Sequence, residues 1–176
     1  MTPREPLKIL VDVRPPKWGD KTMKDGIEFL KDLVRLDHQR QYVILANQSA
    51  PFAFTTQSWN FSLDVVGFRP GFLLDGLALA FFLKIHRASI LHSFNLSTAR
   101  FTRCPIILSL PEDEKVISHL KPGALRRAKK ILVRDETMKK EMVRHLGAEE
   151  EKIIITPSAG VLVQVYQDVA AEFSRL

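Results

Sequence analysis

Short, mostly apolar runs alternate along this chain with segments of helical periodicity. Residues 8–13 (KILVDV), 42–46 (YVILA) and 105–110 (PIILSL) are such runs, rich in β-branched and leucine side chains. They do not alternate between apolar and polar residues, as strands with one face in water do. Continuous apolar strands are typical of a parallel sheet that helices cover on both faces. The pattern therefore predicts a Rossmann-like, doubly wound α/β fold with a mostly parallel sheet.

The same patterns place the individual elements. We expect strands at residues 8–13, 42–46, 61–66, 89–92, 105–110, 130–133 and 152–156. Helices are expected at residues 24–36, 72–86, 112–120, 123–129, 135–146 and 161–176. Asp135 is the expected N-cap of its helix and Gly147 the C′ residue that ends it. The helix at 72–86 is apolar nearly all round, which predicts that most of it is buried.

Length and composition limit the number of domains and the compartment. With 176 residues, 45% hydrophobic and 26% charged, the chain suits one globular domain. We expect residues 1–160 to form it, and residues 161–176 to be a helix that packs on the sheet or begins an interdomain linker. Cys104 is the single cysteine, which excludes an internal disulfide. No signal peptide and no metal-ligand spacing are recognisable, so we expect a cytoplasmic protein without a bound metal.

Positive charge is unevenly distributed. The formal net charge is +6, and residues 115–152 hold eleven basic against six acidic side chains, which accounts for five of these charges. Residues 76–111 contain no acidic side chain at all. Such a surface suits an anionic membrane, a phosphorylated ligand or ordinary solvation. The basic side chains expected to face a membrane are Lys115, Lys121, Arg126, Arg127, Lys129 and Lys130. The absence of interleaved aromatic residues and of a helix-turn-helix pattern argues against nucleic acid.

Polar side chains gather where three expected strands end, the usual ligand-binding edge of such sheets. Arg14, Trp18 and Lys21 follow the first strand, and His92 and Asn95 follow the fourth. These five are candidates to line a cleft, although an ordinary loop with a lysine and a polar turn would also explain them. After the fifth strand, Glu112 is a weak candidate for a catalytic base, while acids there also suit the first turn of a helix. No glycine-rich nucleotide-binding motif is present.

The order of these pieces resembles the N-terminal half of group-one retaining glycosyltransferases of the GT-B fold. The resemblance extends over about residues 7–160. It rests on KILVDVRP at 8–15, LVRLD at 33–37 before QYVIL at 41–45, SILHS at 89–93, CPIILS at 104–109, LRRAKKILV at 125–133, MKKEM at 138–142, LG at 146–147, EKI at 151–153 and TP at 156–157. It implies a domain that binds the sugar acceptor, a glycan or a lipid-linked molecule.

In that family the nucleotide-sugar donor is held mainly by a second domain, which follows a linker corresponding to residues 156–160. The resemblance therefore implies a donor-binding domain in a longer chain or a separate subunit, and no cofactor apart from this donor substrate. We expect the isolated chain to be inactive. The chain could also attach peripherally to the inner face of a membrane, and it could form a homodimer.

Three departures from the family pattern support a different hypothesis. Lys21-Thr22-Met23 stands where the family has a glycine-containing loop, Pro111-Glu112 replaces a His-Asp pair, and Asp135 replaces a serine. A proline side chain cannot exchange a proton. The alternative to a glycosyltransferase domain is thus a catalytically silent binding or interaction module with the same fold.

Overall fold

The computed structural model describes residues 6–14, 21–48, 51–52, 55, 58–67, 75–95, 103–110, 122–156 and 158–173. Within these ranges lie seven strands, which are β1 (Lys8–Asp12), β2 (Gln41–Ala46), β3 (Phe61–Val65), β4 (Ile90–Ser93), β5 (Ile106–Ser109), β6 (Ala128–Val133) and β7 (Ile153–Ile155). The helices are α1 (Lys21–Leu36), α2 (Asp75–Ile85), α4 (Pro122–Arg127), α5 (Glu136–Leu146) and α6 (Ala159–Phe173), with a short 3-10 turn η2 at Glu150–Lys152.

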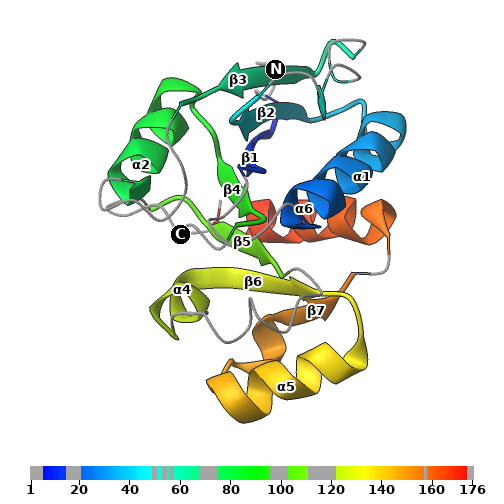
Figure 1. Ribbon diagram of the computed structural model, residues 1–176, viewed down its shortest axis with the longest axis vertical. Coiled ribbons are helices and arrows are strands. Elements are labelled where there is room, and N and C mark those ends of the chain that lie inside the picture. The colour runs from blue at the N-terminus through cyan, green and yellow to red at the C-terminus, as the bar shows by residue number, and fades with distance from the viewer. Residues whose placement is uncertain are drawn as a thin grey trace.

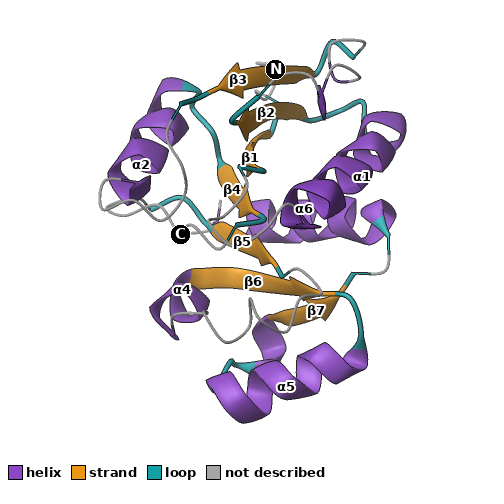
Figure 2. Cartoon of the chain, viewed as in Figure 1, coloured by secondary structure: helices purple, strands orange, loops and turns teal. Residues whose placement is uncertain are grey.

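The strands form one sheet in the order β3-β2-β1-β4-β5-β6-β7 (Figure 1). Every neighbouring pair is parallel, as in β1 and β4, where Ile9 lies opposite Ile90 and Asp12 opposite Ser93. Helices connect the strands on both sides of the sheet (Figure 2). The predicted Rossmann-like α/β fold is confirmed, and the described strands are all parallel rather than mostly so.

Two hydrophobic clusters cover the two faces of the sheet. Because successive strand residues point to opposite faces, Leu10 and Leu91 belong to one cluster and Ile9 and Ile90 to the other. The first cluster packs against α2, α4 and α5, and the second against α1 and α6. This two-sided burial explains why the strands are continuous apolar runs.

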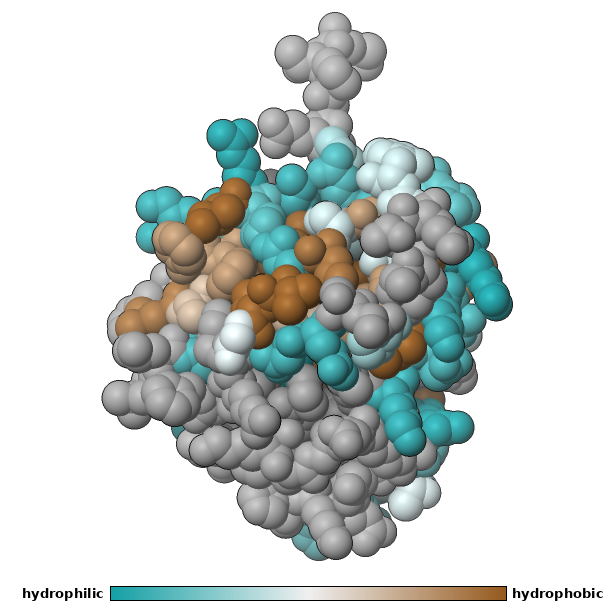
Figure 3. All heavy atoms as spheres, turned by 45° about the horizontal axis from the view of Figure 1, so that its top comes forward, coloured by the Kyte–Doolittle hydropathy of each residue, from teal (hydrophilic) through white to brown (hydrophobic). Residues whose placement is uncertain are grey.

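The prediction of a mostly buried helix at 72–86 is wrong for one side of α2. Leu79 and Leu83 pack on the sheet, whereas Leu77, Phe81 and Ile85 are about half exposed or more. In the space-filling view, apolar atoms gather on the side of the molecule where Figure 1 places α2 (Figure 3). A single layer of helices on a sheet buries only one stripe of each helix, whatever the composition of the opposite stripe.

The boundary between α4 and β6 also differs from expectation. The helix expected at 123–129 ends at Arg127, because Ala128 already pairs with Ile106 in the parallel ladder. The capping residues of α5 are confirmed: the Asp135 side chain accepts a hydrogen bond from Met138 N, and Gly147 ends the helix at a φ of 60°. The helix expected at 112–120 lies outside the described residues.

Helix α6 packs on the sheet next to α1, which answers one of the questions left open by the sequence. Its buried stripe consists of Leu162, Val165, Tyr166 and Val169. In the sequence, Val161, Val165, Val169 and Phe173 recur every four residues and predict such a stripe; Val165 and Val169 are buried as expected, whereas Phe173 is 41% exposed. The buried stripe also includes Tyr166, whose hydroxyl forms a buried hydrogen bond that is described below.

Candidate functional site

The order of the strands reverses between β1 and β4. From β1 the chain proceeds outward through β2 and β3, then returns to β4 on the other side of β1 and continues to β7. Such a reversal is called the switch point of the sheet. In open parallel sheets, ligands bind in the crevice at the carboxyl ends of the two strands that flank it. The ends of β1 and β4, at Asp12 and Ser93, are therefore the first place to look for a site.

A buried network of charged side chains occupies this position. The guanidinium group of Arg14 donates two hydrogen bonds to the Asp12 carboxylate, from Nε at 2.8 Å and from Nη2 at 2.7 Å. Arg14 Nη2 also lies 2.9 Å from Oδ1 of Asp75, the first residue of α2. Asp12 and Arg14 are completely buried, and Asp75 is 5% exposed.

The network holds Arg14 in its charged form. Burial opposes the charge, but the hydrogen bonds and the negative charges of Asp12 and Asp75 outweigh it and raise the pKa of Arg14 above its ordinary value. Alternation along β1 turns Asp12 and Arg14 toward α2, since Val11 and Val13 belong to the opposite cluster. The ion pairs thus join the end of β1 to the start of α2.

Asn95 ties the end of β4 to the same structure. Its amide Nδ2 donates to the carbonyl oxygen of Arg14 at 3.0 Å, and the hydroxyl of Ser93 donates to Asn95 Oδ1 at 3.0 Å. The backbone continues the connection, because Phe94 N donates to Asp12 O at 3.0 Å. Of the predicted cleft residues, Arg14 and Asn95 are therefore brought together, with Asn95 only 4% exposed.

His92 lies on the opposite face of the sheet. Its Nδ1 is 2.6 Å from the Tyr166 hydroxyl on α6, and its Nε2 is 2.7 Å from the Ser109 hydroxyl at the end of β5. The rings of Phe29, Phe94 and Tyr166 surround it, with centroid distances of 5.7, 4.5 and 5.7 Å. Complete burial lowers the pKa of His92 to about 3, so the imidazole is neutral at physiological pH.

Glycine at position 26 allows α1 to approach this region closely. A Cβ added to Gly26 would lie 3.0 Å from the Cγ1 atom of Val13 and 3.7 Å from the Phe94 ring. Both contacts are residues that directly follow β1 and β4. Close helix-to-strand packing at the first turn after a strand is one use of glycine in nucleotide-binding sheets, and here it brings α1 against the switch point.

The structure describes only some of the remaining candidate residues. Trp18, Glu112, Lys115 and Lys121 lie outside the described residues, and of Lys21 only the backbone, at the start of α1, is described. Arg126 and Arg127 on α4 and Lys129 on β6 are exposed, and Lys130 is half-buried. Because β6 begins at Ala128, these four lie at the amino end of the sheet, away from the switch point.

Two residues of the site were not singled out by sequence reasoning. Asp75 interrupts the apolar run at residues 72–83, and a lone carboxylate within such a run is itself a signal of a buried ion pair. Tyr166 does not belong to the i, i+4 series of valines in the last helix, although it lies next to the buried Val165. Its hydroxyl partner, His92, lies 74 residues earlier in the chain, and no local pattern links the two.

The described residues give no indication of a metal centre or of a membrane span. Within them, no three His, Cys, Asp or Glu side chains come together as a metal site requires. None of the described helices is both long and apolar enough to cross a bilayer.

Comparison with solved structures identifies a similar fold. The crystal structure of a glycosyltransferase from Rickettsia africae ESF-5 superimposes with a TM-score of 0.60, over 86% of this chain and at 10% sequence identity. The fold is glycosyltransferase-like. The chain spans 42% of the length of that protein. No family model and no curated protein matches the sequence.

Proposed function

We propose that this chain is the acceptor-binding, N-terminal domain of a retaining glycosyltransferase of the GT-B fold. The observation that supports the proposal most directly is the buried network of polar side chains at the switch point of a glycosyltransferase-like sheet. The share of the solved glycosyltransferase that superimposes, 42%, is what one of two similar-sized domains would give. The proposed reaction transfers a sugar from a nucleotide-sugar donor to a hydroxyl of a glycan or lipid-linked acceptor.

In this proposal the described residues shape the acceptor side and a second domain supplies the donor. Arg14 and Asn95 fix the ends of β1 and β4, the edge of the sheet where we place the acceptor. His92 is a positioning residue, because it is fully buried and holds α6 and β5 to β4 through Tyr166 and Ser109. Because both ring nitrogens are hydrogen-bonded inside the core, the imidazole is not placed to accept a proton from a substrate.

A catalytically silent binding module is the second candidate. The observation that favours it is that Asp12, Arg14, His92 and Asn95 are all buried and engaged with other protein groups. Together with Pro111 at the position of the family's histidine, this leaves no described side chain in the switch-point network poised for proton transfer.

The two candidates differ in what the chain does when a donor domain is present. We would first probe a glycan array with the full chain, and then test transfer from radiolabelled nucleotide sugars with and without a donor-binding domain added in trans. A glycosyltransferase domain transfers label to a bound glycan only when the donor domain is present. Glycan binding without transfer in that reconstituted mixture supports the silent module, and absence of glycan binding contradicts both.

The variant Asn95→Asp tests the placement of the acceptor site. It removes the donor to Arg14 O with almost no change of shape, so we expect at least about tenfold weaker glycan binding. Gln39→Glu introduces the same charge at an exposed position beyond the amino end of β2, and should bind glycan like the parent chain. Equal affinities of the two variants would place the acceptor elsewhere.

A further inference from the structure

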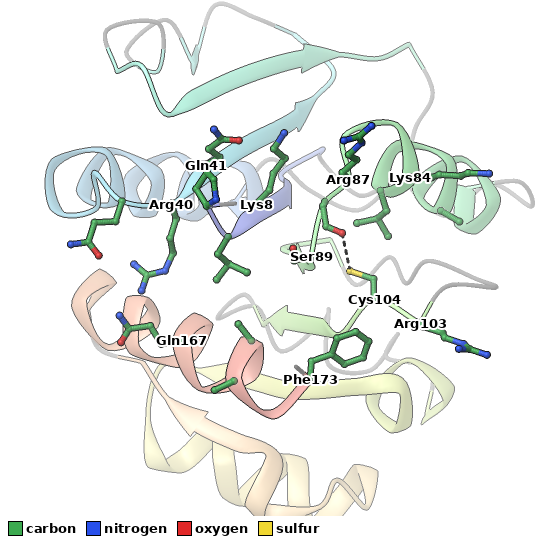
Figure 4. A pocket seen from close by; sticks show the side chains of 18 residues that line it. Lys8, Arg40, Gln41, Lys84, Arg87, Ser89, Arg103, Cys104, Gln167 and Phe173 are labelled. Carbon is green, nitrogen blue, oxygen red and sulfur yellow. Dashed lines mark hydrogen bonds between the residues drawn. The ribbon is translucent and has the colours of Figure 1, made fainter. Parts of the chain in front are cut away.

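A large open cavity lies at the amino ends of the strands, opposite the switch point. Its volume is about 1280 Å³, and Lys8, Gln41, Ser89 and Cys104, which stand at or just before the first residues of β1, β2, β4 and β5, contribute to its wall. The rest comes from the residues before β1 and β5, the connection from α1 to β2, the end of α2 and the end of α6 (Figure 4). The cavity is therefore separated from the proposed acceptor site by the length of the strands.

Among the residues that the structure describes, all charged side chains that line this cavity are cations. They are Lys8, Arg40, Lys84, Arg87 and Arg103. Arg40 is paired with Asp37 at 2.6 Å. In the part of the chain that the structure describes, no ion pair joins any of the other four to a carboxylate. Three of these four come from residues 76–111, the stretch of sequence without an acidic residue.

Arg87 is held in an unusual backbone conformation. Its φ is 52°, the one positive value at a non-glycine residue in the described chain. It follows the last turn of α2, where Ala88 N donates to Leu83 O at 2.9 Å, in a capping motif that usually carries glycine at this position. An arginine here is less favourable than glycine for the backbone. Its side chain is exposed and borders the cavity beside Lys8, whose carbonyl accepts a hydrogen bond from Ser89 N at 2.7 Å.

A second hollow of about 400 Å³ adjoins the first and extends its charge. Arg103, Cys104 and Phe173 line both. Among the described residues of the second hollow, the further cations are Arg126, Arg127, Lys129 and Lys152. Glu172, the acid in this part of its wall, is paired with Lys129 at 2.7 Å, and Lys152 is paired with Glu149 at 2.6 Å. The basic residues that the sequence assigned to a membrane surface thus partly belong to a concave, continuous basic region.

We propose that this cavity binds a small soluble ligand that carries two or more phosphate groups. Several cations around one concavity favour a multiply charged anion, and the planar forks of Arg87 and Arg103 match phosphate oxygens. Leu7, Leu83 and the exposed ring of Phe173 provide an apolar wall for the organic part of the ligand. A concave wall fits such a molecule better than the plane of a bilayer. The inference does not depend on the proposed glycosyltransferase function.

The test is calorimetric titration of the full chain with inorganic tripolyphosphate at about 0.15 M salt, where surface charges more than ~8 Å apart are largely screened. The test variant is Arg87→Gly with Arg103→Gln. It removes two cavity cations, and glycine relieves the backbone of position 87, so its melting temperature should not fall. The matched control, Lys140→Gln with Arg144→Gln, removes two exposed cations of α5.

We expect the cavity variant to bind tripolyphosphate at least about tenfold more weakly than the parent, and the control to bind within about twofold of it. Equal losses in both variants would show attraction by net charge alone and overturn the proposal. So would failure of the parent chain to bind. A further test is sedimentation of the chain with vesicles that contain phosphatidic acid. If millimolar tripolyphosphate does not affect this sedimentation but the cavity variant abolishes it, the cavity binds a lipid headgroup and the proposal of a soluble ligand is overturned.

Discussion

The imidazole of His92 lies between the hydroxyls of Tyr166 and Ser109 and has no contact with solvent. A neutral imidazole has one donor and one acceptor nitrogen, and two hydroxyls can satisfy both. Protonation would create a charge among aromatic rings, which is why burial lowers the pKa of His92 to about 3. The residue therefore acts through the packing that it holds together.

This burial predicts how stability depends on pH. Between pH 6.5, the ordinary pKa of an unfolded histidine, and about 3, the unfolded chain binds a proton at His92 that the folded chain does not. The free energy of unfolding should consequently decrease as the pH falls through this window, by up to about 1.4 kcal/mol per pH unit from this residue. Urea unfolding of the parent and of His92→Gln at several pH values measures the difference in slope.

His92→Gln should unfold with a shallower dependence on pH between 6.5 and 4.5, even if it is less stable overall. The protonation of Asp37 does not affect this comparison of slopes. Although burial opposes it, hydrogen bonds from Tyr42 and Gln39 and the charge of Arg40 lower the pKa of Asp37, so its contribution is lost only below pH ~4. Identical slopes in the two chains would contradict a neutral, buried His92.

Cys104 provides a second test at the scale of single residues. Its Sγ contacts the carbonyl oxygens of Ala88 and Pro105 at 3.9 and 3.7 Å, and burial raises the pKa of the thiol to about 12, despite an opposing hydrogen bond from the backbone of Leu91. Only the thiolate reacts with alkylating agents. We expect alkylation by iodoacetamide at pH 7.5 to be at least about a hundredfold slower than that of glutathione, as followed by mass spectrometry. A rate near that of glutathione would contradict the raised pKa.

Among the elements, the connection from α1 to β2 has the most extensive side-chain network. Asp37 accepts hydrogen bonds from Arg40 Nη1 at 2.6 Å and from the Tyr42 hydroxyl at 2.5 Å. Asn60, which precedes β3, donates to the carbonyl oxygens of Asp37 and Arg40 at 2.9 and 2.8 Å. The network thus fixes α1, β2 and β3 to one another at the amino end of the sheet.

Removal of Asp37 should be costly, because it leaves Arg40 charged and almost completely buried. We expect Asp37→Ala to lower the free energy of unfolding by about 3–5 kcal/mol. Glu28→Ala is the matched control, since Glu28 and Lys31 form an exposed pair, and it should change stability by less than about 0.5 kcal/mol. Urea unfolding at pH 7 measures both, and similar values for the two variants would show that the Asp37 network does not stabilise the fold.

Element types were predictable from sequence to the extent that they depend on neighbouring residues. The apolar runs predicted the positions of the strands. Asp135 and Gly147 predicted the limits of α5, because capping residues act within one turn of the helix. The burial of Leu162 and Tyr166 in α6 and the end of α4 were not predictable, since both depend on contacts with distant strands. The same holds for the site: Arg14 and Asn95 follow from strand ends, whereas Asp75 and Tyr166 are recruited by tertiary packing.

At the scale of the whole molecule, the two ends of the sheet have different characters. The carboxyl ends of β1 and β4 carry a buried network in which Asp12 and Asp75 compensate the charge of Arg14. The amino ends surround a cavity in which every charged side chain of the described wall is a cation. We infer two separate binding regions, one for a sugar acceptor and one for a phosphorylated ligand.

Amide chemical-shift mapping of the full chain with a glycan found on the array tests the central claim most directly. The account predicts shift changes at the carboxyl ends of β1 and β4, at Val13, Arg14, Phe94 and Asn95, and at Gly26 in α1, with little change at Lys8, Gln41 or Ser89. Tripolyphosphate should perturb the second set and not the first. Glycan-induced changes confined to the amino ends of the strands would contradict an acceptor site at the switch point.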